Sequence, residues 1–121
     1  MRASRIWVLS LSLLASGAAL ADAPALKNLQ VLPKTTTKDD IKAIMRAQSK
    51  ALGVECDFCH DVPDMASDKL ETKKIARQMM KMTMEINDKW IKGMKDADKH
   101  PVTCGTCHQG KDQPPAFIPG K

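Results

Sequence analysis

Cys56-Asp57-Phe58-Cys59-His60 and Cys104-Gly105-Thr106-Cys107-His108 are two copies of one pattern, Cys-x-x-Cys-His, and this pair decides the fold of the 121-residue chain. Together they use all four cysteines and two of the three histidines. Two thiols at this spacing can add across the two vinyl groups of a haem, and the adjacent imidazole then reaches the iron. Each copy therefore predicts one haem c. The predicted attachment residues are Cys56, Cys59, Cys104 and Cys107, and the predicted proximal iron ligands are His60 and His108.

Other uses of paired cysteines fit this sequence less well. Zinc ribbons place their two pairs about 15–20 residues apart, whereas 44 residues separate Cys59 from Cys104. A ribbon also has no need of a histidine after each second cysteine. A thioredoxin-like site would need one motif at a βαβ junction, and a disulfide framework would not explain the repeated histidines. Covalent haem is the prediction that accounts for all six residues.

The N-terminus predicts export, which cytochrome c maturation requires. Arg2 and Arg5 precede an apolar stretch over residues 6–14, and Ala19-Leu20-Ala21 has the small-x-small form of a signal peptidase site. We expect residues 1–21 to be a cleavable signal peptide and residues 22–121 to be a periplasmic dihaem domain. An uncleaved anchor is the alternative, although the apolar stretch is shorter than the roughly 20 residues of a membrane span.

Charge and composition limit the partners. The formal charge of +5 falls to +3 when the signal peptide is removed, and four haem propionates would offset that excess, so nucleic-acid binding gains no support. Scattered lysines indicate a solvated surface, with a patch for an acidic redox partner as the alternative. Phe58, Trp90 and Phe117 are the only aromatic residues after the signal peptide. Such a chain buries a marginal core by itself, so we expect two haems to supply apolar surface and the apoprotein to be largely unfolded.

The periodicity predicts an all-α fold: few helices and long loops packed around two covalently bound haems, in a two-unit haem repeat. We expect residues 22–36 to form an extended arm or loop, because Pro24 and Pro33 interrupt them and they lack sustained periodicity. One helix begins after Thr37 as N-cap and ends near Leu52, before Gly53. A second begins at Ser67 or Asp68 and ends near Gly93. Its apolar line is Leu70 or Ile75, Met79, Met82, Ile86 and Trp90, and its expected surface residues are Lys73, Arg77, Lys81 and Asp88.

Each iron also needs a distal ligand. Met45 lies eleven residues before Cys56, and Met82 lies 22 residues before Cys104 on the apolar line. Either thioether can return over a haem, so Met45 is predicted for the first haem and Met82 for the second. His100, four residues before Cys104, is the rival for the second iron. The other helical methionines are expected to be ordinary core residues: Met79, Met80, Met84 and Met94.

Three stretches carry a resemblance to a known family: Met45-x₆-Leu52-Gly53-Val54-x-Cys56-x-Phe58-Cys59-His60, then Ala76 with Lys81-Met82 and Asn87, then Val102-Thr103-Cys104-x-Thr106-Cys107-His108-Gln109-Gly110. In this order they resemble the cytochrome c subunit of photosynthetic reaction centres. That family has four haems in two paired halves, and this chain resembles one half, as do small dihaem cytochromes of non-photosynthetic bacteria. The resemblance implies Met45 and Met82 as distal ligands. The sequence lacks two haem units and a reaction-centre docking segment, which argues against a photosynthetic role.

Two irons closed by His and Met would exchange single electrons and bind no substrate. We therefore expect an electron-transfer protein, not an enzyme, that passes electrons between redox proteins as donor and acceptor and that docks, where required, on a membrane redox complex. The alternatives are a small haem enzyme, such as a peroxidase or reductase, and a haem-based sensor, each with one open iron. A chain of this size leaves little room for a substrate pocket. The sequence names neither donor nor acceptor.

Overall fold

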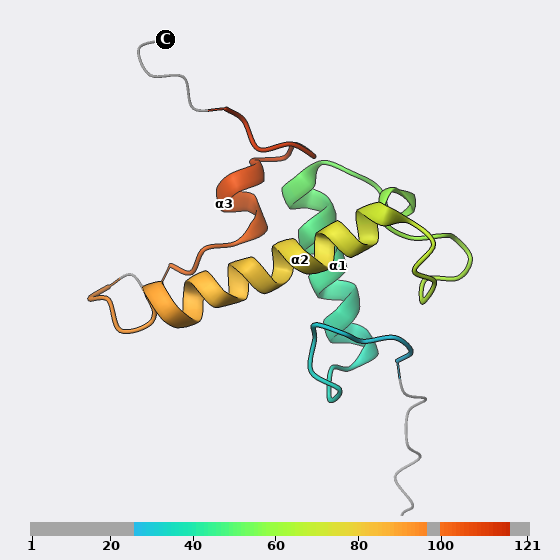
Figure 1. The fold of residues 1–121 in the computed structure, drawn as a ribbon, viewed down its shortest axis with the longest axis horizontal. Coiled ribbons are helices and arrows are strands. Elements are labelled where there is room, and N and C mark those ends of the chain that lie inside the picture. Colours follow the sequence, from blue (N-terminus) through green and yellow to red (C-terminus); the bar gives the residue numbers. More distant parts are fainter. Residues whose placement is uncertain (1–25, 97–99, 117–121) are drawn as a thin grey trace, which may run out of the picture.

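The computed structural model describes residues 26–96 and 100–116, and its regular elements there are helical (Figure 1). The α-helices are α1 (Lys38–Leu52), α2 (Glu71–Ile86) and α3 (Cys104–His108). A 3-10 turn covers Cys56–Phe58, and a π-helical turn, Asn87–Ile91, extends α2. The described ranges contain no β-strand, which confirms the predicted all-α class. The predicted signal peptide, residues 1–21, lies outside the described residues.

The first helix, α1, begins and ends where the sequence predicts. The Thr37 hydroxyl accepts the Asp40 N–H at 3.2 Å, and the Asp40 carboxylate accepts the Thr37 N–H at 3.2 Å in return. This capping box satisfies two backbone donors that a helix N-terminus otherwise leaves open. Gly53 ends the helix with φ +67°, a left-handed conformation that favours glycine.

The predicted start of α2 at Ser67 or Asp68 is wrong, because the helix begins at Glu71. Leu70, the residue before it, has extended backbone. Asp68 is instead held outside the helix, where its carboxylate accepts hydrogen bonds from Asn28 at 2.9 Å and from Gln30 at 3.1 Å. A contact with the N-terminal arm, far away in sequence, therefore overrides the local signal for an N-cap at this position.

Each end of α2 is tied to one of the two motifs. In its first turn, the Thr72 hydroxyl donates to the carbonyl of Phe58, inside the first motif. At its other end, the Asn87 side chain donates to the Val102 carbonyl at 2.7 Å and accepts the Val102 N–H at 2.8 Å, just before the second motif. The helix is therefore a spacer that fixes the two motifs relative to each other.

The second motif forms α3, which packs directly against the end of α1 (Figure 1). The Gly110 N–H donates to the Ala51 carbonyl at 2.8 Å. Gly53 lies so close that a Cβ atom there would stand 2.2 Å from the Gly110 carbonyl oxygen. The absence of a side chain at Gly53 thus allows the backbones of the two halves to touch.

The described polypeptide buries little apolar surface of its own. Within these residues, Leu29 is the only buried apolar side chain. The apolar line predicted along α2 is largely exposed, since Ile75, Met79, Met82 and Trp90 all face outward. In the part of the chain described, no helix is long and apolar enough to span a membrane.

Candidate haem-binding sites

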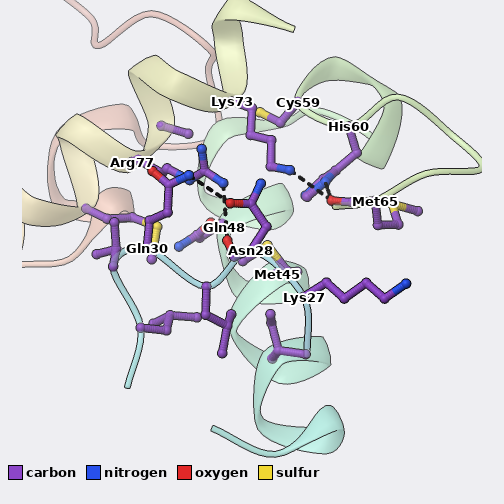
Figure 2. Close-up of a pocket in the computed structure, with 16 residues that line it drawn as sticks. Lys27, Asn28, Gln30, Met45, Gln48, Cys59, His60, Met65, Lys73 and Arg77 are labelled. Atoms are coloured by element: carbon purple, nitrogen blue, oxygen red, sulfur yellow. Dashed lines mark hydrogen bonds between the residues drawn. The ribbon is translucent and has the colours of Figure 1, made fainter. Parts of the chain in front are cut away.

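The first motif opens onto a cavity of about 110 Å³ that forms between the N-terminal arm, α1, the motif and α2. Figure 2 shows the residues that line it, with Met45 on α1 and Cys59 and His60 on the motif. The structure thus brings the predicted distal methionine and the predicted proximal histidine to one cavity. Two further methionines line the same cavity among the described residues, Met65 after the motif and Met80 on α2.

His60 is oriented through one ring nitrogen. Its Nδ1 lies 3.0 Å from the carbonyl oxygen of Met65. A carbonyl can only accept a hydrogen bond, so Nδ1 carries a proton, and in the neutral ring Nε2 then keeps its lone pair. That tautomer is the one in which Nε2 can bind a metal.

A network of charged side chains surrounds this bond, and sequence reasoning missed it. Lys73 and Arg77, both expected on the surface, line the cavity instead, and Lys73 is only 8% exposed. The Lys73 ammonium donates to the carbonyls of Met65 at 2.9 Å and Ser67 at 2.5 Å. Lys73, Ala76 and Met80 share one helix face at i, i+3 and i+7, and this spacing was the available sign that Lys73 faces inward.

Asp68 is the anion of this network. Its carboxylate lies 3.4 Å from the Lys73 ammonium and 2.8 Å from the Arg77 guanidinium. The hydrogen bond from Asn28, and then the contacts with Arg77, lower the pKa of the Asp68 carboxyl from 3.8 to about 2. Asp68 is therefore ionised at neutral pH and joins the arm, the loop before α2 and α2 itself.

The second motif is built differently, because it forms α3 itself. The Thr103 N–H donates to the Thr106 hydroxyl at 2.9 Å, which closes the N-terminus of this short helix. His108 Nδ1 lies 2.9 Å from the Lys111 carbonyl oxygen. The same reasoning as for His60 therefore leaves the His108 Nε2 lone pair free to bind a metal.

The structure does not place the predicted second distal ligand in an enclosed site. Met82 is 48% exposed on the outer side of α2 and does not line the cavity of the first motif. His100, its rival, is exposed as well. The choice between these two side chains stays as open as the sequence left it.

The residues present fit a covalently attached haem at each motif. All four cysteines are free thiols, and burial raises the pKa of the Cys59 thiol. The first cavity is smaller than the roughly 300–1,000 Å³ of typical small-molecule sites. A macrocycle bonded to the exposed Cys56 would therefore also cover surface beyond the cavity. Among the residues described, no three His, Cys, Asp or Glu side chains gather into a group that could hold a metal ion by themselves.

Comparison with known proteins places the chain in a family. The family model described as photosynthetic reaction centre cytochrome C subunit matches residues 9–118. The chain is 34% identical over 93 residues to the photosynthetic reaction center cytochrome c subunit of Roseobacter denitrificans, covering 73% of this chain and 25% of that protein. It is 32% identical over 85 residues to cytochrome c-554 of Chloroflexus aurantiacus, covering 70% of this chain and 20% of that protein.

The chain spans a quarter or less of the length of these two relatives. No solved structure matches it. The match of the family model over most of the sequence nevertheless decides the relationship, and this chain belongs to the photosynthetic reaction centre cytochrome c subunit family.

Proposed function

We propose that the chain is a dihaem c-type cytochrome that transfers single electrons between redox proteins. The observation that carries the proposal is the matched state of the two motif histidines. His60 and His108 each hold Nδ1 against a backbone carbonyl, at 3.0 and 2.9 Å, three to five residues further along the chain. A chance Cys-x-x-Cys-His sequence has no reason to fix both imidazoles in the tautomer that a metal needs.

The distal residues make each site one that exchanges electrons. Met45 shares the cavity of His60, and Met82 lies on the apolar line of α2, at the position that the family pattern gives to the second ligand. When bound, haem c supplies iron that gains and loses one electron without releasing its ligands. If His60 and Met45 held one iron and His108 and Met82 held the other, neither iron would have an open position for a substrate. The exposed line Ile75, Met79, Met82 and Trp90 would then be the apolar surface against which the second macrocycle packs.

The proposal includes location and partners. Residues 1–21 have the form of a signal peptide, so we place the mature domain, residues 22–121, in the periplasm. The relative from Roseobacter denitrificans, which is named as a reaction-centre subunit, supports docking on a membrane redox complex. The electron donor and acceptor would be other redox proteins.

Haem stoichiometry and ligation test this proposal. A pyridine haemochrome assay should return two c-type haems per chain. The ferric protein should show the weak sulfur-to-iron band at long wavelength. Met45→Ala and Met82→Ala should each remove part of that band.

Matched methionines provide the controls. Met80 lines the same cavity as Met45, and Met84 is exposed on α2 to the same degree as Met82, at 50% and 48%. Met80→Ala and Met84→Ala should leave the band intact. If His100→Ala changes the second haem's spectrum and Met82→Ala does not, His100 is the ligand. Binding of carbon monoxide by the untreated ferrous protein would favour the alternative, an enzyme or a sensor with one open iron.

A further inference from the structure

The carbonyl oxygen of Met65 accepts two hydrogen bonds, one from His60 Nδ1 at 3.0 Å and one from the Lys73 ammonium at 2.9 Å (Figure 2). A carbonyl oxygen has two lone pairs, so both bonds can form at once. The ammonium draws electron density from the oxygen. The oxygen is then a weaker acceptor for His60, and the imidazole is a weaker donor to whatever Nε2 binds.

Lys73 brings a positive charge that solvent screens little. It is 8% exposed, and its ammonium has three oxygen partners: the Met65 carbonyl at 2.9 Å, the Ser67 carbonyl at 2.5 Å and, as an ion pair, the Asp68 carboxylate at 3.4 Å. Asp68 does not neutralise it alone, because the same carboxylate oxygen also lies 2.8 Å from the Arg77 guanidinium. Two cations therefore share one anion beside the cavity, and the cluster has a net positive charge.

The second motif has no equivalent. His108 Nδ1 bonds to the Lys111 carbonyl, and within the described residues no side-chain cation donates to that oxygen. Lys111 carries a positive charge of its own, but its side chain is exposed, unlike that of Lys73. The two motif histidines thus make the same bond, but only the bond of His60 is polarised by a buried charge.

We propose that Lys73 is a positioning residue that raises the reduction potential of the first haem above that of the second, acting through the Met65 carbonyl on His60. This inference rests on the proposed function. A weaker axial donor and a nearby positive charge both disfavour the ferric state, so both effects raise the potential. The consequence is a direction: the haem at Cys56 and Cys59 is the preferred resting place of an electron, and the haem at Cys104 and Cys107 passes electrons to it.

The variants separate charge from structural support. Lys73→Gln keeps donors near the carbonyls and removes the charge, so the first haem's potential should fall. Lys73→Arg keeps the charge, so the first haem's potential should stay close to the wild-type value. Asp68→Asn removes the only anion of the cluster and should raise the potential. Lys74→Gln is the control, because Lys74 is the next residue, is exposed and pairs with Glu71 at 2.8 Å.

The measurement is the midpoint potential of each haem in the holoprotein, followed by NMR, with the haem methyl signals assigned through contacts to Phe58 and Thr106. For Lys73→Gln we expect the first haem's oxidation equilibrium to change by about tenfold, which is about 59 mV for one electron. The second haem and the Lys74 control should change much less.

A purely structural role gives a different result. Losing either Lys73 or Asp68 would then loosen the same loop, so both variants would shift the first haem's potential in the same direction or only reduce haem loading. Opposite shifts support the inference, and equal or absent shifts overturn it while two haems per chain still uphold the proposed function. If the haemochrome assay finds no haem in the wild-type protein, the proposed function itself fails.

Discussion

The two Cys-x-x-Cys-His motifs share a sequence pattern and differ in what holds them. The first lies beside a cavity that the arm, α1 and α2 enclose. Ion pairs of Asp68 with Lys73 and Arg77 join the loop before α2 to α2 itself beside this cavity. The second forms the short helix α3, which uncharged hydrogen bonds hold: two between the Asn87 side-chain amide and the Val102 backbone, and one from the Gly110 N–H to the Ala51 carbonyl at the end of α1. The same sequence motif is thus held by side-chain charge in one half and by amide and backbone hydrogen bonds in the other.

This difference teaches where each site is vulnerable. A cavity between three segments depends on the group that fills it, because the described polypeptide buries only Leu29 as an apolar residue. The helix α3 depends instead on the close approach at Gly53 and on the side-chain amide of Asn87. Changes in the two halves should therefore have different consequences.

The largest effect should follow removal of haem attachment at the first motif. In Cys56→Ser/Cys59→Ser, the arm, α1 and α2 lose the group that joins them, and most of the helical circular dichroism should be lost. In Cys104→Ser/Cys107→Ser, the first half keeps its haem and its charge network, so the larger part of the helical signal should remain. Equal losses from both variants would show that the halves do not differ in this way.

The contact between the two halves should be nearly as sensitive. Gly53→Ala places a side chain at φ +67° and 2.2 Å from the Gly110 carbonyl oxygen. Left-handed strain of about 1–2 kcal/mol and overpacking of about 1–3 kcal/mol predict a loss of roughly 2–5 kcal/mol. Gly93→Ala is the matched control, because Gly93 has φ +84° and no atom within 4 Å of the added carbon. Thermal unfolding of the two variants should differ by the cost of the Gly110 contact, and equal shifts would contradict that contact.

Much of the fold could be predicted from local signals. Thr37 and Gly53 marked the ends of α1 because N-cap and left-handed C-cap chemistry act over a few residues. The two Cys-x-x-Cys-His motifs predicted haem attachment by their residue types and spacing. The position of Met45, eleven residues before Cys56, predicted that it would lie near His60, and both residues line one cavity. All of these signals depend on neighbours close in sequence.

The features that local signals did not predict depend on contacts between residues far apart in the sequence. The start of α2 and the burial of Lys73 both follow from Asp68, whose partners include Asn28, 40 residues earlier. A lysine is almost never buried without a partner, so a helical pattern alone assigns it to the surface. Met79 and Met82 are the converse case, since their apolar helical spacing predicts burial and the structure leaves both side chains exposed.

The ties at the two ends of α2 allow a direct comparison of the halves. Asn87→Ala leaves the N–H and carbonyl of Val102 without partners and should cost roughly 1–3 kcal/mol. Its spectroscopic effect should be confined to the second haem. Thr72→Val removes the hydroxyl that donates to the Phe58 carbonyl, and it should lower the free energy of unfolding by about 1 kcal/mol. Its spectroscopic effect should be confined to the first haem. Haem-specific NMR shifts would check this assignment, and a disturbance of both haems by Asn87→Ala would show that α2 does not isolate them.

The smallest effect concerns the helix caps, where the two halves again differ in charge. Asp40 completes the cap of α1, and its hydrogen bonds with Thr37 lower the pKa of the Asp40 carboxyl below 3.8, whereas a neutral hydroxyl, Thr106, completes the cap of α3. Because the folded-state pKa is the lower one, the stabilisation by Asp40 is complete above pH 3.8 and is lost as the pH falls through the lowered value. Thr37→Ala should cost about 1 kcal/mol at pH 7, and this cost should shrink at acid pH, while the cost of Thr106→Val should stay constant. Denaturant unfolding at pH 7 and pH 3 measures both; parallel pH profiles would mean that charge does not distinguish the two caps.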